Sequence, residues 1–351
     1  MTESVITLED VARAAGVSPS TVSRVLNGSA KVAAPKHDTV MRVVRELGYR
    51  PNPIAQGLAS GRSMSIGVLT QDITSPFYGD MLHGIEEGLY GSPYHPVFAS
   101  GHWHVEDETS ALHTLLNRPV DALIVLGGHT PDASLLALAG RVPVIAVGRR
   151  LHGHDLACLN IDNVSGAHQG VQHLLDLGHT HIAHIAGPSA HRDARDRLDG
   201  YRRALQNAGL PINDQLIVEG DFMEPSGLLA VETLITRGAP FTAIFAANDQ
   251  MAYGARLALF RRGIRVPEDV SLVGFDGLPG SAFTTPPLTT VRQPTFEMGR
   301  AAAQAALNAL NGNAPHLPRL ATELVVREST ALHRARTARR ARKTVTVGGA
   351  P

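Results

Sequence analysis

The sequence predicts an all-α helix-turn-helix headpiece, joined by a hinge helix to a larger two-lobed α/β domain. Two observations lead to this fold class. Residues 7–48 contain three short helical patterns separated by turn signals, and residues 65–274 alternate apolar strands with amphipathic helices. The length of 351 residues fits one small and one large domain. We expect the headpiece at 1–50, the hinge and linker at 51–62, the two-lobed domain at 63–330 and a basic, disordered tail at 331–351.

The first helix is expected to begin after Thr7. Thr7 and Asp10 have the spacing of a capping box, although Glu or Gln is the usual partner. Val11, Ala14 and Ala15 fall at helical spacing and give the helix an apolar face. Gly16 suits a turn in which the chain adopts a positive φ.

The second helix is expected from Pro19 to Asn27. Ser18 is a good N-cap and Pro19 fits the first helical position. Val22 and Val25 form its inner face. Two helices joined by a short glycine-containing turn make a helix-turn-helix, whose second helix enters the major groove of DNA.

A third helix is expected from Pro35 to Leu47, closed by Gly48. Residues 1–62 hold eight basic and five acidic side chains, and this modest positive balance suits phosphate contacts. A small helical bundle with solvated charges would share any one of these features. Their order at the N-terminus favours DNA binding.

The alternating pattern that follows predicts parallel sheets with helices on both faces. It occurs in two consecutive runs, so we expect two similar lobes. The strands are expected at 65–69, 97–99, 122–126, 144–147, 184–186, 216–218, 243–246 and 271–274, and helices at 77–90, 106–117, 164–177 and 197–208.

Polar and aromatic side chains follow the predicted strands, where open α/β sheets bind their ligands. Arginine, carboxylate and aromatic groups together suit a polyhydroxyl ligand. Two aspartates, Asp162 and Asp249, have helix capping as an equal alternative, and Trp103 lies either in the cleft or in the core. The set comprises Asp72, Phe77, Tyr78, Trp103, Arg149, Arg197, Phe222, Asn248, Asp249 and Asp276.

Several protein classes are disfavoured. No apolar run reaches membrane-spanning length, no signal-peptide pattern is present, and Cys158 is the only cysteine, so we expect a cytoplasmic protein without a membrane partner. The histidines at 102, 104, 179, 181 and 184 lack Glu or Cys at zinc-site spacing, and catalytic glycine motifs are missing. We therefore expect no metal, no cofactor and no enzymatic activity.

Charge is unevenly distributed along the chain. The tail carries six basic and no acidic side chains, whereas residues 63–330 carry 18 basic and 27 acidic ones. An acidic central domain argues against nucleic acid as its ligand. The tail either attracts DNA nonspecifically or is only solvated, and it lacks the leucine heptads of a tetramerising coiled coil.

Residues 7–62 resemble the headpiece of the lactose-repressor (LacI/GalR) family of bacterial transcription regulators. The resemblance rests on Thr7-Leu-Glu-Asp-Val-Ala, Ala15-Gly-Val-Ser, Thr21-Val-Ser-Arg-Val-Leu-Asn and Leu47-Gly-Tyr-Arg-Pro-Asn, and it continues to about residue 330. It implies a periplasmic-binding-protein-like (type I) architecture for the two-lobed domain, with the ligand between the lobes.

The resemblance also implies DNA contacts. Pro19, Ser20 and Arg24 match base-facing positions, and a guanidinium can bond guanine bidentately. Thr21, Ser23 and Asn27 match phosphate-contacting positions, with local backbone hydrogen bonds as the alternative.

In the hinge, Ala55 and Leu58 match DNA-contacting positions, and Leu58 matches a leucine that wedges into the minor groove. Gln56-Gly57 departs from the family, which often has arginine there. Glycine also weakens a helix this short, so we expect the hinge to become helical only when it is paired on DNA.

For the larger domain, the resemblance implies effector contacts at or near Asp72, Phe77, Tyr78, Arg149, Arg197, Phe222, Asn248 and Asp276. The expected protein is a repressor that binds a palindromic double-stranded DNA operator as a homodimer and responds to a small-molecule effector, expected to be a sugar. A nucleobase or nucleoside effector is the first alternative, and a sugar-binding protein without a regulatory role is the second.

Overall fold

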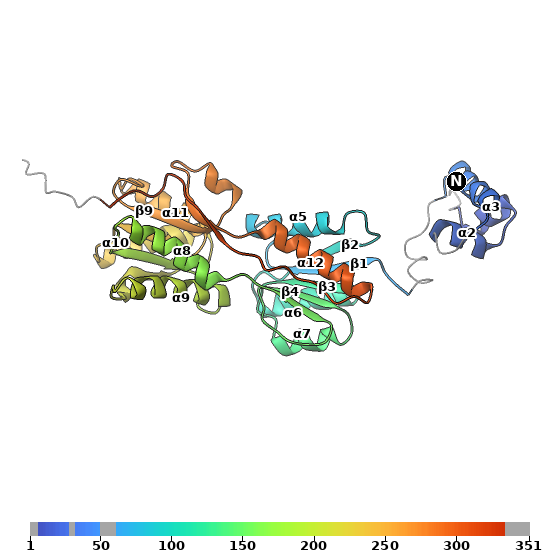
Figure 1. Cartoon of the computed structure of the whole chain (residues 1–351), viewed down its shortest axis with the longest axis horizontal. Coiled ribbons are helices and arrows are strands. Elements are labelled where there is room, and N and C mark those ends of the chain that lie inside the picture. The colour runs from blue at the N-terminus through green and yellow to red at the C-terminus, as the bar shows by residue number, and fades with distance from the viewer. Residues whose placement is uncertain (1–5, 28–31, 50–60, 334–351) are drawn as a thin grey trace, which may run out of the picture. The chain divides into compact units, whose positions relative to one another are not determined.

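The computed structural model describes residues 6–27, 32–49 and 61–333. The chain divides into two compact units (Figure 1). The first comprises Met1–Ser65 with Arg118–Asp121, and the second comprises Ile66–Asn117 with Ala122–Pro351. The hinge predictions at 55–58 and the tail at 334–351 lie outside the described residues.

The headpiece contains α1 (Leu8–Ala15), α2 (Pro19–Asn27) and α3 (Ala34–Leu47). The capping box is confirmed, because the backbone N–H of Thr7 donates to the Asp10 carboxylate at 3.0 Å and that of Asp10 donates to the Thr7 hydroxyl at 3.3 Å. Gly16 has φ +65° and ends α1. The Ser18 hydroxyl accepts the backbone N–H of Thr21 and caps α2 as expected.

A small apolar core joins the three helices of the headpiece. Its fully or nearly fully buried members are Val11, Ala12, Val22, Val25, Val40 and Val43. The apolar faces predicted at Val11 of α1 and at Val22 and Val25 of α2 are therefore confirmed, whereas Ala14 of α1, predicted to face inward, is exposed. Only one side of each helix is needed for this core, which leaves the opposite side of α2 at the surface.

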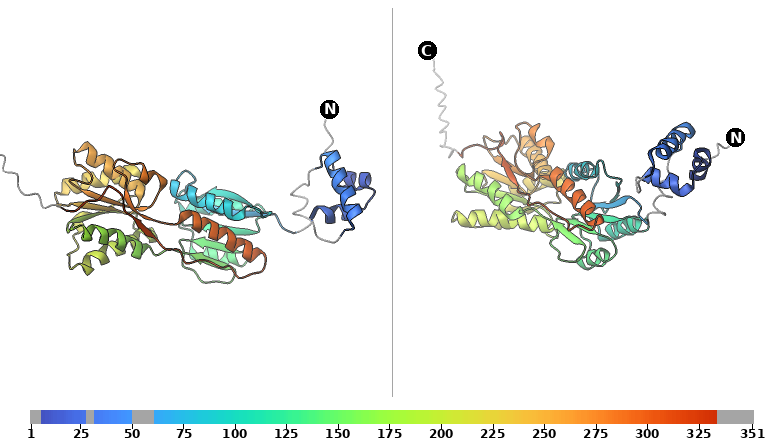
Figure 2. Two further views of the ribbon diagram at one scale, coloured as in Figure 1. Left: turned by 45° about the horizontal axis from the view of Figure 1, so that its top comes forward. Right: turned by 45° about the vertical axis from the view of Figure 1, so that its right-hand side comes forward.

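The first lobe is built on a five-stranded sheet in the order β2-β1-β3-β4-β5, and β1, β3, β4 and β5 pair in parallel. Helices α5 (Pro76–Leu89) and α12 (Thr295–Leu310) pack against each other, and α6 (Val105–Leu116) and α7 (Asp132–Ala139) share a core on the sheet (Figure 2). The strands are β1 (Ser65–Thr70), β2 (His95–Ser100), β3 (Ala122–Leu126), β4 (Val144–Val147) and β5 (Leu156–Leu159).

The second lobe is built on a six-stranded sheet in the order β11-β10-β9-β8-β6-β7, in which the β10–β11 pair is antiparallel. Helices α8 (Asn163–Asp176) and α9 (Arg192–Asn207) contribute to one core cluster, and α10 (Glu224–Arg237) and α11 (Asp249–Arg261) to another. Its strands are β6 (Ile182–Ala186), β7 (Ile217–Glu219), β8 (Ala243–Ala246), β9 (Ser271–Asp276), β10 (Thr289–Arg292) and β11 (Glu323–Val325), with short 3₁₀ turns η1 (Asp214–Leu216) and η2 (Pro279–Ala282).

The chain passes between the lobes three times, after β5, before α12 and after α12. The expectation of two consecutive lobes is therefore incomplete, because α12 returns to the first lobe and contacts β3, β4 and β5. Helices α5 and α12 approach each other closely at glycines. A Cβ on Gly299 would lie 1.9 Å from the Met81 carbonyl oxygen, and one on Gly84 would lie 2.1 Å from that of Phe296.

Several element boundaries differ from the predictions. Helix α9 begins at Arg192 rather than 197, so Arg197 lies in its second turn and not directly after a strand. Strand β9 extends to Asp276, which is its last residue. The sequence analysis did not predict helices α7, α10, α11 and α12 or strands β5, β10 and β11.

The second lobe also continues beyond residue 330, where we placed the start of the tail. The backbone N–H of His333 donates to the Leu177 carbonyl at 2.8 Å, and that of Ala331 donates to the Ser271 hydroxyl at 3.1 Å. Among the described residues, no helix has the length and apolar character needed to cross a membrane.

Candidate functional site

The outer face of α2 presents the residues predicted to read DNA. Pro19, Ser20 and Arg24 are exposed, and Thr21 is partly buried. The Ser18 hydroxyl lies 2.9 Å from those of both Ser20 and Thr21, so these two side chains have local partners. Arg24 forms no ion pair with another described residue. Ser23 is also partly buried, and the side chain of Asn27 lies outside the description.

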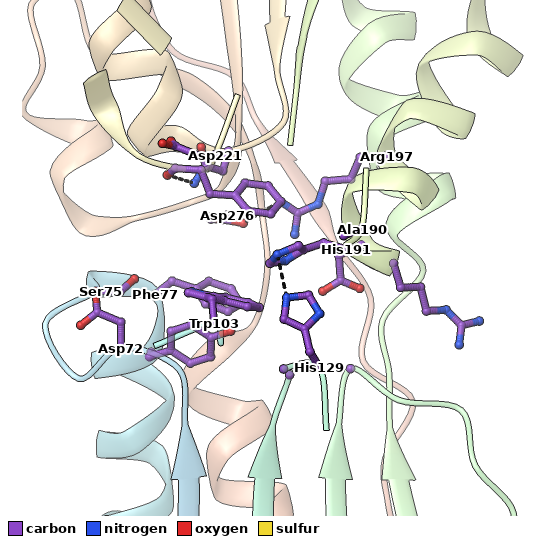
Figure 3. Close-up of a pocket in the computed structure, with 18 of the residues that line it drawn as sticks. Asp72, Ser75, Phe77, Trp103, His129, Ala190, His191, Arg197, Asp221 and Asp276 are labelled. Carbon is purple, nitrogen blue, oxygen red and sulfur yellow. Dashed lines mark hydrogen bonds and ion pairs between the residues drawn. The ribbon is translucent and has the colours of Figure 1, made fainter. Parts of the chain in front are cut away.

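A cavity of about 430 Å³ lies between the two lobes (Figure 3). Loops that follow strands of both sheets, together with the start of α9, form its walls. All eight residues predicted to contact an effector line it: Asp72, Phe77, Tyr78, Arg149, Arg197, Phe222, Asn248 and Asp276. Trp103 lines it as well, which places this residue in the cleft rather than in the core.

Arg197 and Asp276 form a buried ion pair on the second-lobe wall. Their side chains are 5% and 6% exposed, and the Arg197 Nη1–Asp276 Oδ1 distance is 3.3 Å. Arg197 also donates to the Asn163 side chain at 3.0 Å and to the Ala247 carbonyl at 2.5 Å. Its guanidinium lies 4.0 Å from the Phe275 ring centroid. The arginine therefore holds the wall together in addition to facing the cavity.

Burial raises the pKa of Asp276 to about 7, although Arg197 acts in the opposite direction and Gln293, which donates to the carboxylate at 2.7 Å, also lowers it. The neighbouring carboxylates of Asp249 and Asp193 add to the increase. Asp276 therefore gains or loses a proton near neutral pH, and it can accept or donate a hydrogen bond in the cavity.

Arg149 is the corresponding arginine of the first-lobe wall. Its Nη2 donates to the carbonyl oxygens of Gly128 and Thr130 at 2.7 and 2.9 Å, and its Nη1 lies 3.2 Å from the Asp132 carboxylate. These bonds fix the loop that follows β3 to the loop that follows β4. Its buried Nε has no protein partner among the described residues.

Two predicted contact residues are already engaged with the protein. The Asn248 side chain caps α11 by accepting the Met251 N–H at 2.9 Å, and it donates to the Phe222 carbonyl at 2.8 Å. One oxygen of Asp72 accepts from the backbone and hydroxyl of Thr74 at 2.8 and 2.7 Å. Each side chain retains only part of its hydrogen-bonding capacity for a ligand.

Aromatic rings form a continuous row along the cavity. Phe77 packs edge-on against Tyr78 at 5.1 Å between centroids, Tyr78 lies 5.9 Å from Trp103, and Trp103 lies 4.4 Å from His191. Phe222 continues the row 5.6 Å from His191. Trp103, Phe222 and Asp276 have φ values of +60°, +71° and +108°, and such strained backbone is typical of functional sites.

The sequence-based prediction missed several cavity residues that can interact with a ligand, among them His129, His191, Asp193 and Asp221. Two of them touch across the cleft, because the Nε2 atoms of His129 and His191 are 3.2 Å apart. His129 follows a strand and a Gly-Gly pair, a signal that could have identified it. His191 and Asp193 lie at the start of α9, which we predicted to begin five residues later.

The two ambiguous aspartates have structural roles outside the cavity lining. Asp162 accepts the Ser165 N–H at 2.9 Å and caps α8. Asp249 is fully buried and accepts from Leu278, Ser281 and Thr290 at 2.8, 2.6 and 2.6 Å. Burial raises the pKa of Asp249 to about 6, although these three hydrogen bonds act to lower it.

The histidine clusters also have protein partners. His179 contacts the Thr242 hydroxyl at 2.9 Å and the Ala331 carbonyl at 3.0 Å. His184 stacks between Tyr201 and Phe245, and burial lowers its pKa to about 4. Within the described ranges, no group of three or more metal-ligating side chains is arranged to hold a metal ion.

Two family models match the chain. Residues 7–52 match the model described as bacterial regulatory proteins, lacI family, and residues 171–330 match a periplasmic binding protein-like domain. The chain is 37% identical over 310 residues to the HTH-type transcriptional regulator GalR of Escherichia coli K12, which covers 88% of this chain and 90% of GalR. It is 33% identical over 333 residues to the HTH-type transcriptional repressor CytR of the same strain, with 93% and 97% covered.

Solved structures agree in fold. The Lac repressor dimer bound to operator and the anti-inducer ONPF has a TM-score of 0.83 and 32% identity, covering 93% of this chain and 100% of that one. The complex of the transcriptional regulator CelR with cellobiose has a TM-score of 0.69 and 36% identity, covering 92% and 99%. With its helix-turn-helix headpiece and two-lobed domain, the chain is a DNA-binding transcriptional regulator and not an enzyme, and it belongs to the lacI family of bacterial regulatory proteins.

Proposed function

We propose that this protein is a cytoplasmic repressor that binds a palindromic operator as a homodimer and is controlled by an uncharged sugar in the interlobe cavity. The observation that carries the proposal is the cavity itself, which combines paired charged groups with a row of aromatic rings. Its location at the carboxyl ends of the strands is the usual position for ligands of α/β sheets.

The DNA part of the proposal is supported by the exposed face of α2. Pro19, Ser20 and Arg24 are exposed on this face, and the local bonds of Ser18 to Ser20 and Thr21 leave Arg24 as the strongest candidate for base readout. The matching Lac repressor structure is a dimer on its operator, and two headpieces read two half-sites in the same way.

The ligand part is supported by the charge balance of the cavity. Of the described residues that line it, five are arginines and five are aspartates. Two of the arginines are paired with lining aspartates, and a third, Arg192, is paired with Asp196 outside the lining. A sugar phosphate would need a surplus of positive charge, which these pairs do not provide. An uncharged sugar fits better, because its hydroxyls can donate to carboxylates and accept from guanidinium groups while a ring face rests on Trp103 or Phe77.

The size of the cavity, about 430 Å³, lies at the lower end of the range for small-molecule sites, roughly 300–1,000 Å³. This volume suits a compact ligand of one or two sugar rings. The CelR structure contains cellobiose in the same fold, which supports a carbohydrate without identifying it.

A thermal-shift screen of the full-length protein tests the ligand class. A ligand that binds only the folded state raises the free energy of unfolding, by about 2.7 kcal/mol when its concentration is 100 times its Kd. The unfolding temperature rises as a result. We expect a rise with one or more neutral mono- or disaccharides and none with their phosphates. A rise confined to nucleobases or nucleosides, whose planar rings could stack on the aromatic row, would refute the sugar assignment.

The DNA part needs a separate test. Selection of bound sequences from random duplexes, followed by gel-shift titration, is expected to give a palindrome bound by a dimer. The ligand found in the thermal screen is then expected to change the affinity for that palindrome. Arg197 is a poor choice of variant here, because its removal would leave Asp276 buried without its ion pair.

A further inference from the structure

The His129–His191 contact joins the two lobes across the cavity. His129 follows β3 in the first lobe, and His191 precedes α9 in the second. Their Nε2 atoms are 3.2 Å apart, and Figure 3 shows the bond crossing the middle of the site. Of the hydrogen bonds between side chains in the part of the chain that the structure describes, this one alone links the opposite walls of the cavity.

Both histidines are held in place by their backbones. The buried carboxylate of Glu108 accepts the N–H of His129 at 2.7 Å and the N–H and hydroxyl of Thr130 at 2.6 and 2.7 Å. On the other side, the N–H of His191 donates to the Pro188 carbonyl at 2.9 Å. The two rings therefore meet because their loops are fixed, which reduces the entropic cost of the contact.

The protonation of the two rings decides whether they can bond. A neutral imidazole has one donor and one acceptor nitrogen, so a bond forms if at least one ring is neutral. Two imidazolium rings offer only donors and repel each other.

The surrounding charged groups do not stabilise a second proton on the pair. Asp132 pairs with Arg149, and Asp193 accepts from Asn163 at 3.0 Å, so these carboxylates are engaged elsewhere. Burial, with the nearby positive charges of His129 and Arg195, lowers the pKa of His191 to about 4. Glu108 accepts the backbone N–H of His129. The charged residues that line the cavity near the pair are Asp132, Arg149, Arg192, Asp193, Arg195 and Asp276.

We propose that the His129–His191 hydrogen bond is a latch that favours the closed arrangement of the two lobes before any effector binds. Removing either imidazole, or protonating both, opens it. The latch itself does not require the proposed function; only its role in regulation rests on that function. If an effector binds in the cavity, the latch sets the equilibrium between closed and open lobes that the effector must shift.

Trp103 reports the state of this latch directly. It is the only tryptophan of the chain, and its ring lies 4.4 Å from His191 and 5.9 Å from His129. Separation of the lobes removes His191 from its surface and admits water. Acrylamide quenching of tryptophan fluorescence in the full-length protein, without DNA or effector, therefore measures opening.

The test compares His129→Ala, which removes the bond, with His129→Gln, whose amide can still bond His191. One neutral hydrogen bond corresponds to about a fivefold change in a two-state ratio. At about pH 7.5 we expect stronger quenching in His129→Ala, with His129→Gln close to the parent protein. His181→Gln, at an exposed histidine before β6, is the matched control and should change nothing.

The pH dependence gives a second, independent test. In the parent protein, quenching should rise as the pH falls toward about 4, where His191 becomes protonated. In His129→Gln it should stay low, because a protonated His191 can still donate to the amide oxygen. Circular dichroism at each pH verifies that the fold is retained.

Equal quenching in His129→Ala and the parent protein would overturn the latch, and so would the same acid response in His129→Gln. If His129→Ala does not fold, the parent and the His129→Gln protein still decide the question through their pH profiles. Because neither test uses an effector, a failed ligand screen would refute the proposed sugar and leave the latch result standing.

Discussion

Replacing Asp276 with asparagine tests the electrostatics of the cavity wall. The carboxylate is 6% exposed, and burial raises its pKa to about 7 despite the Arg197 ion pair at 3.3 Å. An acid with a raised pKa binds a proton more tightly in the folded than in the unfolded protein. It therefore makes the fold less stable as the pH rises from about 4 to about 7.

The size of the effect follows from that pKa. The ordinary value is 3.8 and the folded value is about 7, a difference of about three units. At about 1.4 kcal/mol per unit, the parent protein loses about 4 kcal/mol of stability through Asp276 between pH 4 and pH 8. Asparagine cannot titrate, so this contribution is missing in Asp276→Asn.

Urea unfolding, followed by far-UV circular dichroism, measures the difference between the two proteins at each pH. We expect the variant to gain about 4 kcal/mol relative to the parent protein as the pH rises from about 4 to about 8. Contributions from groups that do not interact with Asp276 cancel in this difference. Glu86→Gln, at an exposed site on α5, should differ from the parent protein by the same free energy of unfolding at every pH. A difference that is likewise independent of pH for Asp276→Asn would refute the reasoning.

Three further predictions concern the headpiece and the helix pair of the first lobe. Arg24→Ala should weaken operator binding by about 1–3 kcal/mol and relax the base choice at one position, and gel shifts with an unchanged sequence preference would remove Arg24 from base readout. Gly16→Ala should cost the headpiece about 1–2 kcal/mol because φ is +65°, with Gly16→Asn costing less in the same thermal melt; equal melts would contradict the assigned turn. Gly299→Ala should destabilise the larger domain by about 1–3 kcal/mol or more, since its Cβ would overlap the Met81 carbonyl, whereas Gly79→Ala, with open space around it, should be neutral or gain up to about 1 kcal/mol by urea unfolding.

The headpiece could be predicted from the sequence almost completely. Its helices are short, and their ends are marked by residues whose local chemistry decides the structure: the Thr7–Asp10 capping box, Ser18 before Pro19, and Gly16 with a positive φ. Such signals depend on neighbours within four residues, so the sequence contains them in full.

The cavity could be predicted only in part. All eight candidate residues line it, since loops at strand ends converge in any parallel α/β sheet. The sequence could not show which polar groups are already used, as with Asn248 capping α11, because that depends on partners distant in the chain. The same holds for the His129–His191 contact, whose members are 62 residues apart.

The return of α12 was missed for a related reason. The helix is rich in alanine and has Gly299 at its contact with α5, which suits close packing against any partner. Its periodicity reveals an apolar face but not the lobe that covers it. Only the route of the chain decides that the first lobe receives a helix encoded after the second.

This route has a consequence for synthesis on the ribosome. The first lobe is not complete when its own five strands have emerged, because the helix that covers β3, β4 and β5 begins at Thr295. Domains tend to fold in order from the N-terminus as they are made. Here the earlier lobe must wait, with an apolar face uncovered, until the later lobe has been translated. A nascent chain halted before residue 295 should therefore attract chaperones through its first lobe.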